Sequence, residues 1–197
     1  MTFQELQEAL GRQLNPASWS QHPNGGGWVE ATARVDPTAT VSGIVSDNAR
    51  VYEGAHVSGN AWVYGDARVY GTAWVYEGAR VYGDARVFGT ARVFGTARVY
   101  GNARVSGTAQ VSGTARVYGD AWHFSPLQIR GTRHFVTTCD HSHLQIGCLI
   151  RTIEKWREGF ESTGRRQGYT PDEIAEYGLI INLAADWLNL KFPKEQP

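Results

Sequence analysis

The 197-residue sequence has few cysteines, no long apolar run and no excess of either charge. Two cysteines, Cys139 and Cys148, are too few for a disulfide framework, although a single bond between them stays open. No stretch approaches the roughly 20 apolar residues that cross a bilayer, and the first residues lack the order of a secretory signal. Lysine and arginine together number 19, as do aspartate and glutamate. We therefore expect a cytoplasmic protein without membrane contact and without a charge-driven affinity of the whole chain for polyanions.

A six-residue repeat fills the middle of the chain, and repeats are sought first because they decide the fold. From residue 45 to residue 117 a valine recurs every six residues, and an alanine follows each valine by four. Earlier repeats keep this spacing up to Val41 but are two residues out of step with Val45. This slip predicts an irregular corner near Ile44. After Trp122 the repeat ends.

Each repeat has the pattern of a short strand followed by a tight corner. In an extended strand alternate side chains point to opposite sides, so Ala-x-Val places alanine and valine together. The Gly-Asp, Gly-Thr and Gly-Asn pairs then turn the chain, because glycine adopts backbone angles that other residues avoid. Coils stacked on one another would bury all the alanines and valines in one shared core.

The Val-x-Gly-x-Ala-x spacing resembles the hexapeptide repeat of left-handed parallel β-helices, a family that includes many acyltransferases and the γ-type carbonic anhydrases. The resemblance implies three repeats per triangular coil, about four coils after Val45 with one or two before it, a left-handed turn and a homotrimer. We expect a mainly β fold: an N-terminal helix and cap over 1–28, a β-helix solenoid over 29–122 and a small α+β segment over 123–197.

The two ends depart from the repeat. Thr2 and Glu5 have capping-box spacing, which predicts a short amphipathic helix that covers the open first coil. After the repeat, HFVTTCDHSHLQIGCLI predicts one or two strands, and two helices follow. Thr170 and Glu173, with Pro171 between them, predict the capped start of the second helix.

The C-terminal segment resembles uncharacterised phage and prophage proteins. The resemblance rests on Ile146-Gly147-Cys148, on Trp156 and on the run from Tyr169 to Ile174. It implies a viral or mobile-element origin, and hence the host cytoplasm as the place of action. It implies no activity.

Two enzymatic alternatives follow from the hexapeptide family. Acyltransferases of this kind use a histidine near a subunit interface as general base, with loops between coils that shape the pocket. Here no loop interrupts the repeats, and His56 is their only internal histidine, which we expect to be a surface residue. A γ-type carbonic anhydrase needs three zinc-binding histidines at an interface, whereas His56 and His123 are far apart in the solenoid. Whether the chain is an enzyme stays open, with the balance against it, and we expect no cofactor.

Four residues after the repeat have the chemistry of zinc ligands: Cys139, His141, His143 and Cys148. If this stretch is one extended strand, alternation places the first three on the same side. The alternative is a strand with exposed histidines and two small buried thiols, and we favour this alternative.

The outward positions of the repeat are its most informative feature. The residue before each valine is mostly arginine or tryptophan, the residue after it is tyrosine, phenylalanine or serine, and acids are confined to the corners. Guanidinium planes and aromatic faces bind planar anionic ligands and pack in protein interfaces. The alternative is that these side chains only stack on one another.

Residues three repeats apart should stack on one face, in ladders with a rung spacing of about 4.8 Å. One face is predicted to carry Trp74 and Arg92 beside Tyr52, Tyr70 and Phe88. Another is predicted to carry the arginines 50, 68, 86 and 104 and Trp122 beside a ladder of four tyrosines. The predicted binding residues are Arg68, Arg86, Arg104, Trp62, Trp74, Trp122, Tyr64, Tyr82, Tyr100 and Tyr118.

These ladders predict a non-enzymatic, phage-associated β-helix that binds a host protein or a small anionic, nucleotide-type ligand. A trimeric hexapeptide-repeat acyltransferase and a structural fibre or virion component are the alternatives.

Overall fold

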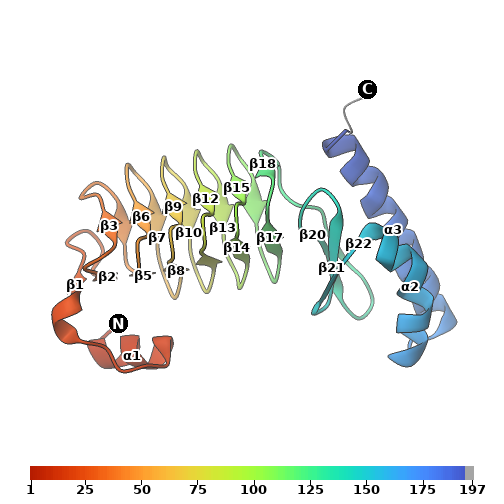
Figure 1. The fold of residues 1–197 in the computed structure, drawn as a ribbon, viewed down its shortest axis with the longest axis horizontal. Coiled ribbons are helices and arrows are strands. Elements are labelled where there is room, and N and C mark those ends of the chain that lie inside the picture. The colour runs from red at the N-terminus through yellow and green to blue at the C-terminus, as the bar shows by residue number, and fades with distance from the viewer. Residues whose placement is uncertain (194–197) are drawn as a thin grey trace. The chain divides into compact units, whose positions relative to one another are not determined.

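A computed structural model describes residues 1–193, so residues 194–197 of the expected C-terminal segment lie outside the described residues. The chain divides into two compact units, one formed by residues 1–114 and 118–125 and the other by residues 115–117 and the chain from Pro126 onward. The first unit is a parallel β-solenoid of about five turns that carries an N-terminal helix. The second unit contains an antiparallel sheet and two helices (Figure 1).

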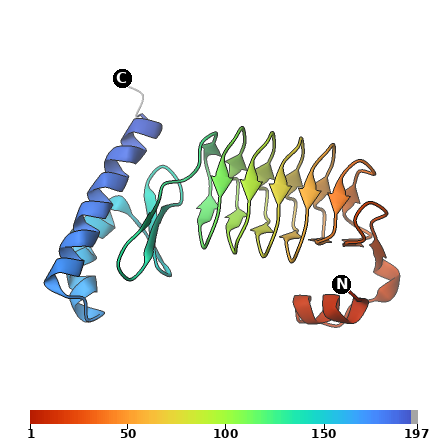
Figure 2. The same cartoon turned by 180° about the vertical axis from the view of Figure 1, so that it is seen from behind.

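Three sheets line the solenoid, and successive repeats add one strand to each sheet in turn (Figure 2). The first sheet contains β1 (Trp19–Gln21), β2 (Trp28–Glu30), β5 (Ile44–Val45), β8 (Trp62–Val63), β11 (Arg80–Val81), β14 (Arg98–Tyr100) and β17 (Arg116–Tyr118). The second sheet contains β4 (Thr40–Val41), β7 (His56–Val57), β10 (Trp74–Val75), β13 (Arg92–Val93) and β16 (Gln110–Val111). The third sheet contains β3 (Arg34–Val35), β6 (Arg50–Val51), β9 (Arg68–Val69), β12 (Arg86–Val87), β15 (Arg104–Val105) and β18 (Ala121–Trp122). Only β1 runs antiparallel to its neighbour, and the strands that follow pair in parallel.

The interior of the solenoid consists of the repeated valines and alanines. Every valine from Val41 to Val117 is fully buried, and so is every alanine from Ala39 to Ala109. Each buried valine contributes on the order of 2 kcal/mol through the apolar surface that it removes from water. The inward assignment of both residue types is therefore confirmed. The left hand implied by the hexapeptide resemblance stays a prediction.

The irregular corner predicted near Ile44 is confirmed. Only Ser42 and Gly43 separate β4 from β5, whereas residues 46–49 separate β5 from β6. The backbone N–H groups of Ser42 and Gly43 both donate to the carbonyl oxygen of Val57, at 2.8 and 3.1 Å. A Cβ atom on Gly43 would lie 2.7 Å from the carbonyl oxygen of Ala61, so the shortened corner requires glycine.

Some corners have an acidic residue where most corners have glycine. Asp47, Glu53 and Glu77 have φ values of 56°, 58° and 59° at positions that glycine occupies in the other turns. For a residue with a Cβ atom this conformation costs about 1 kcal/mol. Each carboxylate offsets that cost by accepting a hydrogen bond from a backbone N–H one turn later. These bonds are Asp47 with Gly65 at 2.9 Å, Glu53 with Gly71 at 2.7 Å and Glu77 with Gly95 at 2.7 Å.

In the last rung of the third sheet the strand register differs by one residue from the predicted one. Ala121 lies opposite Arg104, and Trp122 lies opposite Val105. Trp122 is therefore fully buried and Ala121 is exposed, the reverse of the prediction. The reason is a short corner: only Gly119 and Asp120 separate β17 from β18, and the Arg104 N–H donates to the carbonyl of Asp120 instead of that of the alanine after it, so the inward and outward sides of the strand are exchanged. The large indole takes the core position that valine fills in the other turns.

The N-terminal helix α1 (Phe3–Leu10) begins at the predicted capping box. The Glu5 N–H donates to the Thr2 hydroxyl, and the Thr2 N–H donates to the Glu5 carboxylate. Leu6 is fully buried in a cluster with Trp19 and Ile44. Because Ile44 is on the outer side of the first sheet, α1 covers the side of the first turns (Figure 1). The prediction that this helix covers the open end of the first coil is therefore wrong.

The free edge of β4, the first strand of the second sheet, is covered by a loop and not by α1. The short helix η1 (Pro16–Ser18) leads from α1 into β1. The residues between β1 and β2 then lie beside β4. The Val41 N–H donates to the carbonyl of Asn24, and the Gly27 N–H donates to the carbonyl of Val41, both at 2.8 Å. This edge of the sheet is therefore satisfied by residues 24–27.

The second unit has more strands than the sequence predicted. Its antiparallel sheet contains β19 (Gln128–Arg130), β20 (Phe135–Thr138), β21 (His143–Ile146) and β22 (Leu149–Thr152). Strand β21 ends at Ile146 because Gly147, with a φ of 58°, turns the chain into β22. Helices α2 (Ile153–Arg166) and α3 (Pro171–Lys191) follow, and the capping box of Thr170 and Glu173 at the start of α3 is confirmed.

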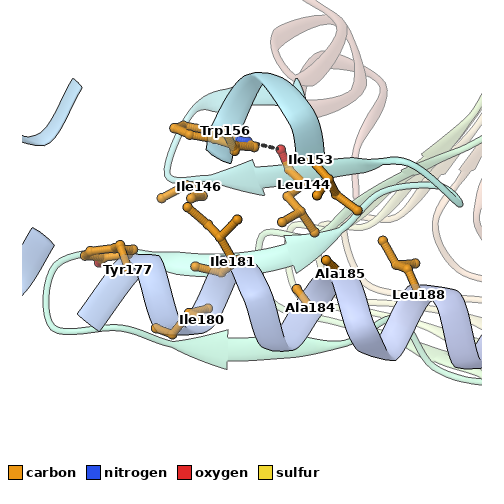
Figure 3. Packing of buried hydrophobic residues seen from close by; sticks show 11 residues of the cluster. Leu144, Ile146, Ile153, Trp156, Tyr177, Ile180, Ile181, Ala184, Ala185 and Leu188 are labelled. Atoms are coloured by element: carbon orange, nitrogen blue, oxygen red, sulfur yellow. Dashed lines mark hydrogen bonds between the residues drawn. The ribbon is translucent and has the colours of Figure 1, made fainter. Parts of the chain in front are cut away.

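A compact apolar core holds these helices against the sheet (Figure 3). Leu144, Ile181 and Leu188 are almost completely buried in it. The indole N–H of Trp156 donates to the carbonyl of Leu144 at 2.9 Å, so the only polar atom of this large side chain is satisfied. None of the helices that the structure describes has the length and hydropathy needed to span a lipid bilayer.

The stacking of the corners can be tested with two glycines of one column. Gly95 and Gly113 both have positive φ, but a Cβ on Gly95 would lie 2.8 Å from the Gly113 nitrogen, whereas one on Gly113 would meet nothing within 4 Å. Gly113→Ala should lower the free energy of unfolding by about 1 kcal/mol through the backbone angle alone. Gly95→Ala should lower it by at least about 2 kcal/mol, because the next turn must also shift. Urea unfolding of the two variants measures the difference, and equal losses would contradict close stacking of the turns.

Candidate functional site

The third sheet presents a column of arginines on its outer side. Five arginines pair in register along β3, β6, β9, β12 and β15, and the valines that follow the last four of them are fully buried. The arginines are Arg34, Arg50, Arg68, Arg86 and Arg104. Arg68 and Arg86, in the middle, are half-buried, and the other three are exposed. We call this column, together with Tyr52, Tyr70 and Phe88, the basic face.

The aromatic ladders lie beside different arginines from those that the sequence predicted. Burial, reinforced by Tyr70, raises the pKa of Tyr52 above its ordinary value, and the nearby Arg68 and Arg86 partly oppose the rise. Tyr52 therefore belongs to the arginine column of its own strand. The reason is local: the residues on either side of an inward valine share the outer side of one strand, and the corner then carries the chain to another sheet.

The predicted tyrosine ladder lies on the first sheet. Burial, reinforced by Tyr82, raises the pKa of Tyr64, and the opposing charges are those of Arg80 and Arg98. We call the outer side of this sheet the tyrosine face. It consists of Trp62, Tyr64, Tyr82, Tyr100 and Tyr118 with Arg80 and Arg98. The predicted partnership of this ladder with Arg68, Arg86 and Arg104 is wrong.

The rings within each ladder are stacked on one another. In the basic face the ring centroids of Tyr52 and Tyr70, and of Tyr70 and Phe88, are 4.9 Å apart and nearly parallel. In the tyrosine face Tyr82 lies 4.8 Å from Tyr64 and 5.1 Å from Tyr100. A planar ligand cannot enter between rings at this spacing without breaking the stack. The edges of the rings are the part that remains available to a partner.

The three tryptophans of the predicted site lie in three different environments. Trp62 donates its indole N–H to the Ser46 hydroxyl at 2.9 Å, and the guanidinium of Arg80 lies 5.7 Å from its ring centroid. Trp74 is 42% exposed on the second sheet, with the His56 ring stacked on it at 4.2 Å. Trp122 is interior and cannot contact a ligand. The predicted residues therefore form three outer faces and not one site.

The arginines of the solenoid are not neutralised by acidic side chains. Within residues 1–193, no solenoid arginine has a carboxylate oxygen within 4.0 Å. Three of the corner acids, Asp47, Glu53 and Glu77, instead accept hydrogen bonds from backbone N–H groups of the next turn. Positive charge is thus concentrated on the flat faces, although the whole chain is neutral.

The predicted metal ligands are not on one strand. The chain turns between β20 and β21, so the Cys139 N–H donates to the His143 carbonyl across a hairpin. Burial, assisted by the charge of Asp140, raises the pKa of the Cys139 thiol to about 12. A neutral buried thiol is a poor metal ligand, since zinc binds the thiolate. Cys148 is exposed in the turn between β21 and β22.

One histidine of this group, His143, contacts a neighbouring carboxylate. The Nδ1 atom of His143 lies 2.8 Å from a carboxylate oxygen of Asp140. Burial alone would raise the pKa of Asp140, but hydrogen bonds from Ser142 and His143 hold it below its ordinary value. In the part of the chain that the structure describes, no three of Cys139, His141, His143 and Cys148 bring their ligand atoms within 4.8 Å of one another.

The basic-face ladder allows a matched test of ring stacking. Tyr70 contacts a ring on each side, whereas Phe88 stacks on Tyr70 alone. Because an aromatic pair contributes about 1 kcal/mol beyond its buried area, Tyr70→Ala should destabilise the solenoid by about 1 kcal/mol more than Phe88→Ala. Thermal unfolding followed by circular dichroism measures both. If Phe88→Ala proves equally damaging, side-chain burial and not stacking accounts for the ladder.

The regular part of the solenoid matches one known family. Residues 45–59, 61–77, 79–95 and 97–113 match the model of the YdcK Beta solenoid repeat. Comparisons with curated proteins and with solved structures found no match. The matched residues are those in which valine and alanine recur without a slip, between the short corner at Gly43 and the altered last rung at Trp122. The repeats of this chain are therefore similar to the YdcK repeat, and the chain is a β-solenoid repeat protein.

Proposed function

We propose that the chain is a non-enzymatic binding protein whose basic face recognises an acidic surface of a protein partner. The observation that carries the proposal is the column of arginines that no carboxylate neutralises. Like charges at the rung spacing repel one another, and the core does not need them, because valine and alanine complete it. A feature that opposes stability without serving the fold is the kind expected at a functional surface.

The stacking of the rings supports a protein partner over a nucleotide. Nucleic-acid-binding surfaces of this composition stack bases on aromatic side chains. Here the face of Tyr70 is covered by a neighbouring ring on each side. The guanidinium groups stay available, and each can form a two-point contact with a carboxylate. Arginine and tyrosine are also the residue types enriched at the centres of protein interfaces.

The resemblances found in the sequence extend this proposal. A homotrimer, which the hexapeptide family implies, would carry three copies of the basic face and increase avidity for a partner with several acidic sites. The resemblance of the C-terminal segment to phage proteins supports a host protein, met in the cytoplasm, as the partner. Acyl transfer has less support, because the repeats contain no loop that could shape a pocket and the His56 ring is stacked on Trp74.

Two double variants with the same change of net charge test the role of the basic face. The probe is poly-L-glutamate at low ionic strength, with binding followed by fluorescence anisotropy. Arg68→Glu with Arg86→Glu should weaken binding at least about tenfold, or about 1.4 kcal/mol, because both groups are at the centre of the column. Arg80→Glu with Arg98→Glu, on the tyrosine face, should have a much smaller effect. Both variants should unfold near the wild-type temperature, since all four arginines are outside the core.

Three outcomes would contradict the proposal. If the wild type does not bind poly-L-glutamate, the hypothesis of an acidic protein partner is wrong. Equal losses in the two variants would show that net charge, and not the basic face, is responsible. Thymidine oligonucleotides that bind more tightly than abasic ones of equal length would show that bases stack on the rings, and would favour a nucleotide ligand instead.

A further inference from the structure

The second unit contains a pocket of about 190 Å³ between its helices and the β21–β22 hairpin. Ile146, Trp156 and Tyr177, which Figure 3 labels in the apolar core, are at most 8% exposed and belong to its lining, so we call them its floor. Phe160 from α2 and Ile174 from α3 add apolar walls. The solenoid contributes no residue to this lining, so the pocket is independent of the basic face.

The polar atoms of the floor and walls are engaged within the protein. The Trp156 indole N–H donates to the carbonyl of Leu144. The Tyr177 hydroxyl accepts hydrogen bonds from the backbone N–H groups of Arg133 and His134, at 3.1 and 2.7 Å, and donates to the carbonyl of His134. The Thr163 hydroxyl accepts a hydrogen bond from Arg151 at 3.1 Å. The pocket therefore offers mainly carbon to an occupant, and no acidic side chain lines it.

Two glycines hold the walls in place. A Cβ on Gly164 would lie 2.8 Å from the Ile174 side chain, and a Cβ on Gly147 would lie 3.1 Å from the His134 ring. Gly147 also has a positive φ. Because the backbone approaches the lining residues this closely, a side chain at either glycine would displace a wall of the pocket.

The rim of the pocket carries polar groups that the protein does not use. His134, Cys148 and Gln167 are exposed and belong to the lining. Among residues 1–193, the side chains of His134 and Gln167 make no hydrogen bond to the protein. An imidazole and an amide can each donate or accept a hydrogen bond. The rim can therefore orient one polar group of a ligand whose apolar body fills the pocket.

We propose that this pocket binds a small, neutral aromatic molecule of the phenol or indole type. An apolar cavity of about 150 Å³ binds benzene, so the pocket has room for one aromatic ring system with a polar substituent. Trp156, Phe160 and Tyr169 supply the aromatic neighbours against which such a ring packs in offset or edge-to-face geometry. The hydroxyl or ring N–H of the ligand then reaches His134 and Gln167 at the rim.

Alkylation of Cys148 provides the first test. Iodoacetamide at pH 8 should modify the exposed Cys148 and spare Cys139, whose burial raises its thiol pKa to about 12. Saturating phenol or indole should slow modification of Cys148 at least about threefold, because the occupied pocket restricts access to its rim. Methyl NMR signals of Ile146 and Ile174 should shift in the same titration. If neither the rate nor the signals change up to the solubility limit of both probes, the proposal is wrong.

Variants of residues at the rim of the pocket test whether phenol binds there. Leu149 lines the pocket and is 38% exposed, whereas Leu179 on α3 is 74% exposed and lies outside the lining. Leu149→Trp should narrow the mouth and weaken phenol binding at least about tenfold, while Leu179→Trp should leave it unchanged. Gln167→Ala, which is too exposed to affect folding, should weaken phenol binding but not toluene binding. Phenol binding that survives both Leu149→Trp and Gln167→Ala would overturn the assignment.

Discussion

The backbone hydrogen bonds between successive turns are the interaction on which the rest of the solenoid depends. The Arg68 N–H donates to the carbonyl of Ala85 and the Tyr70 N–H to that of Val87, at 2.9 and 3.0 Å, and the pattern recurs from turn to turn. These bonds fix both spacing and register, so every side chain lies directly over its counterpart in the turn below. Valines then form a core, rings form stacks and arginines form a column of charge. The surface chemistry is thus a consequence of the same ladder that stabilises the fold.

The regular part of this architecture could be predicted from the sequence, because a period of six residues with buried valine and alanine leaves little choice of fold. The irregular part could not. The inward position of Trp122 depends on a one-residue change of register in the last corner, and the sequence gives no sign of it, because Ala121 still follows Val117 by four positions. The left-handed conformations of Glu53 and Glu77 depend on a hydrogen bond to a later turn. That contact is visible only once the turns are stacked.

The candidate sites show the same limit. The columns of arginine and aromatic residues follow from the period, but their partnership depends on where each corner bends, and the expected pairing of Tyr64 with Arg68 was displaced by one sheet. The pocket of the second unit had no signal in the sequence. His134, Phe160 and Ile174 come from a loop and two helices, and only tertiary packing brings them together.

The stacked corners also bear on how the chain can change in evolution. Arg68 pairs with Arg86, eighteen positions later, and the carboxylate of Glu53 accepts a hydrogen bond from Gly71, also eighteen positions later. Duplication or deletion of one complete turn therefore leaves every remaining residue above a suitable neighbour, whereas a shift of a single residue reverses the sides of a strand, as the register at Trp122 shows. The basic face can consequently lengthen or shorten by whole rungs. The length of this column of charge can thus change without redesign of the core.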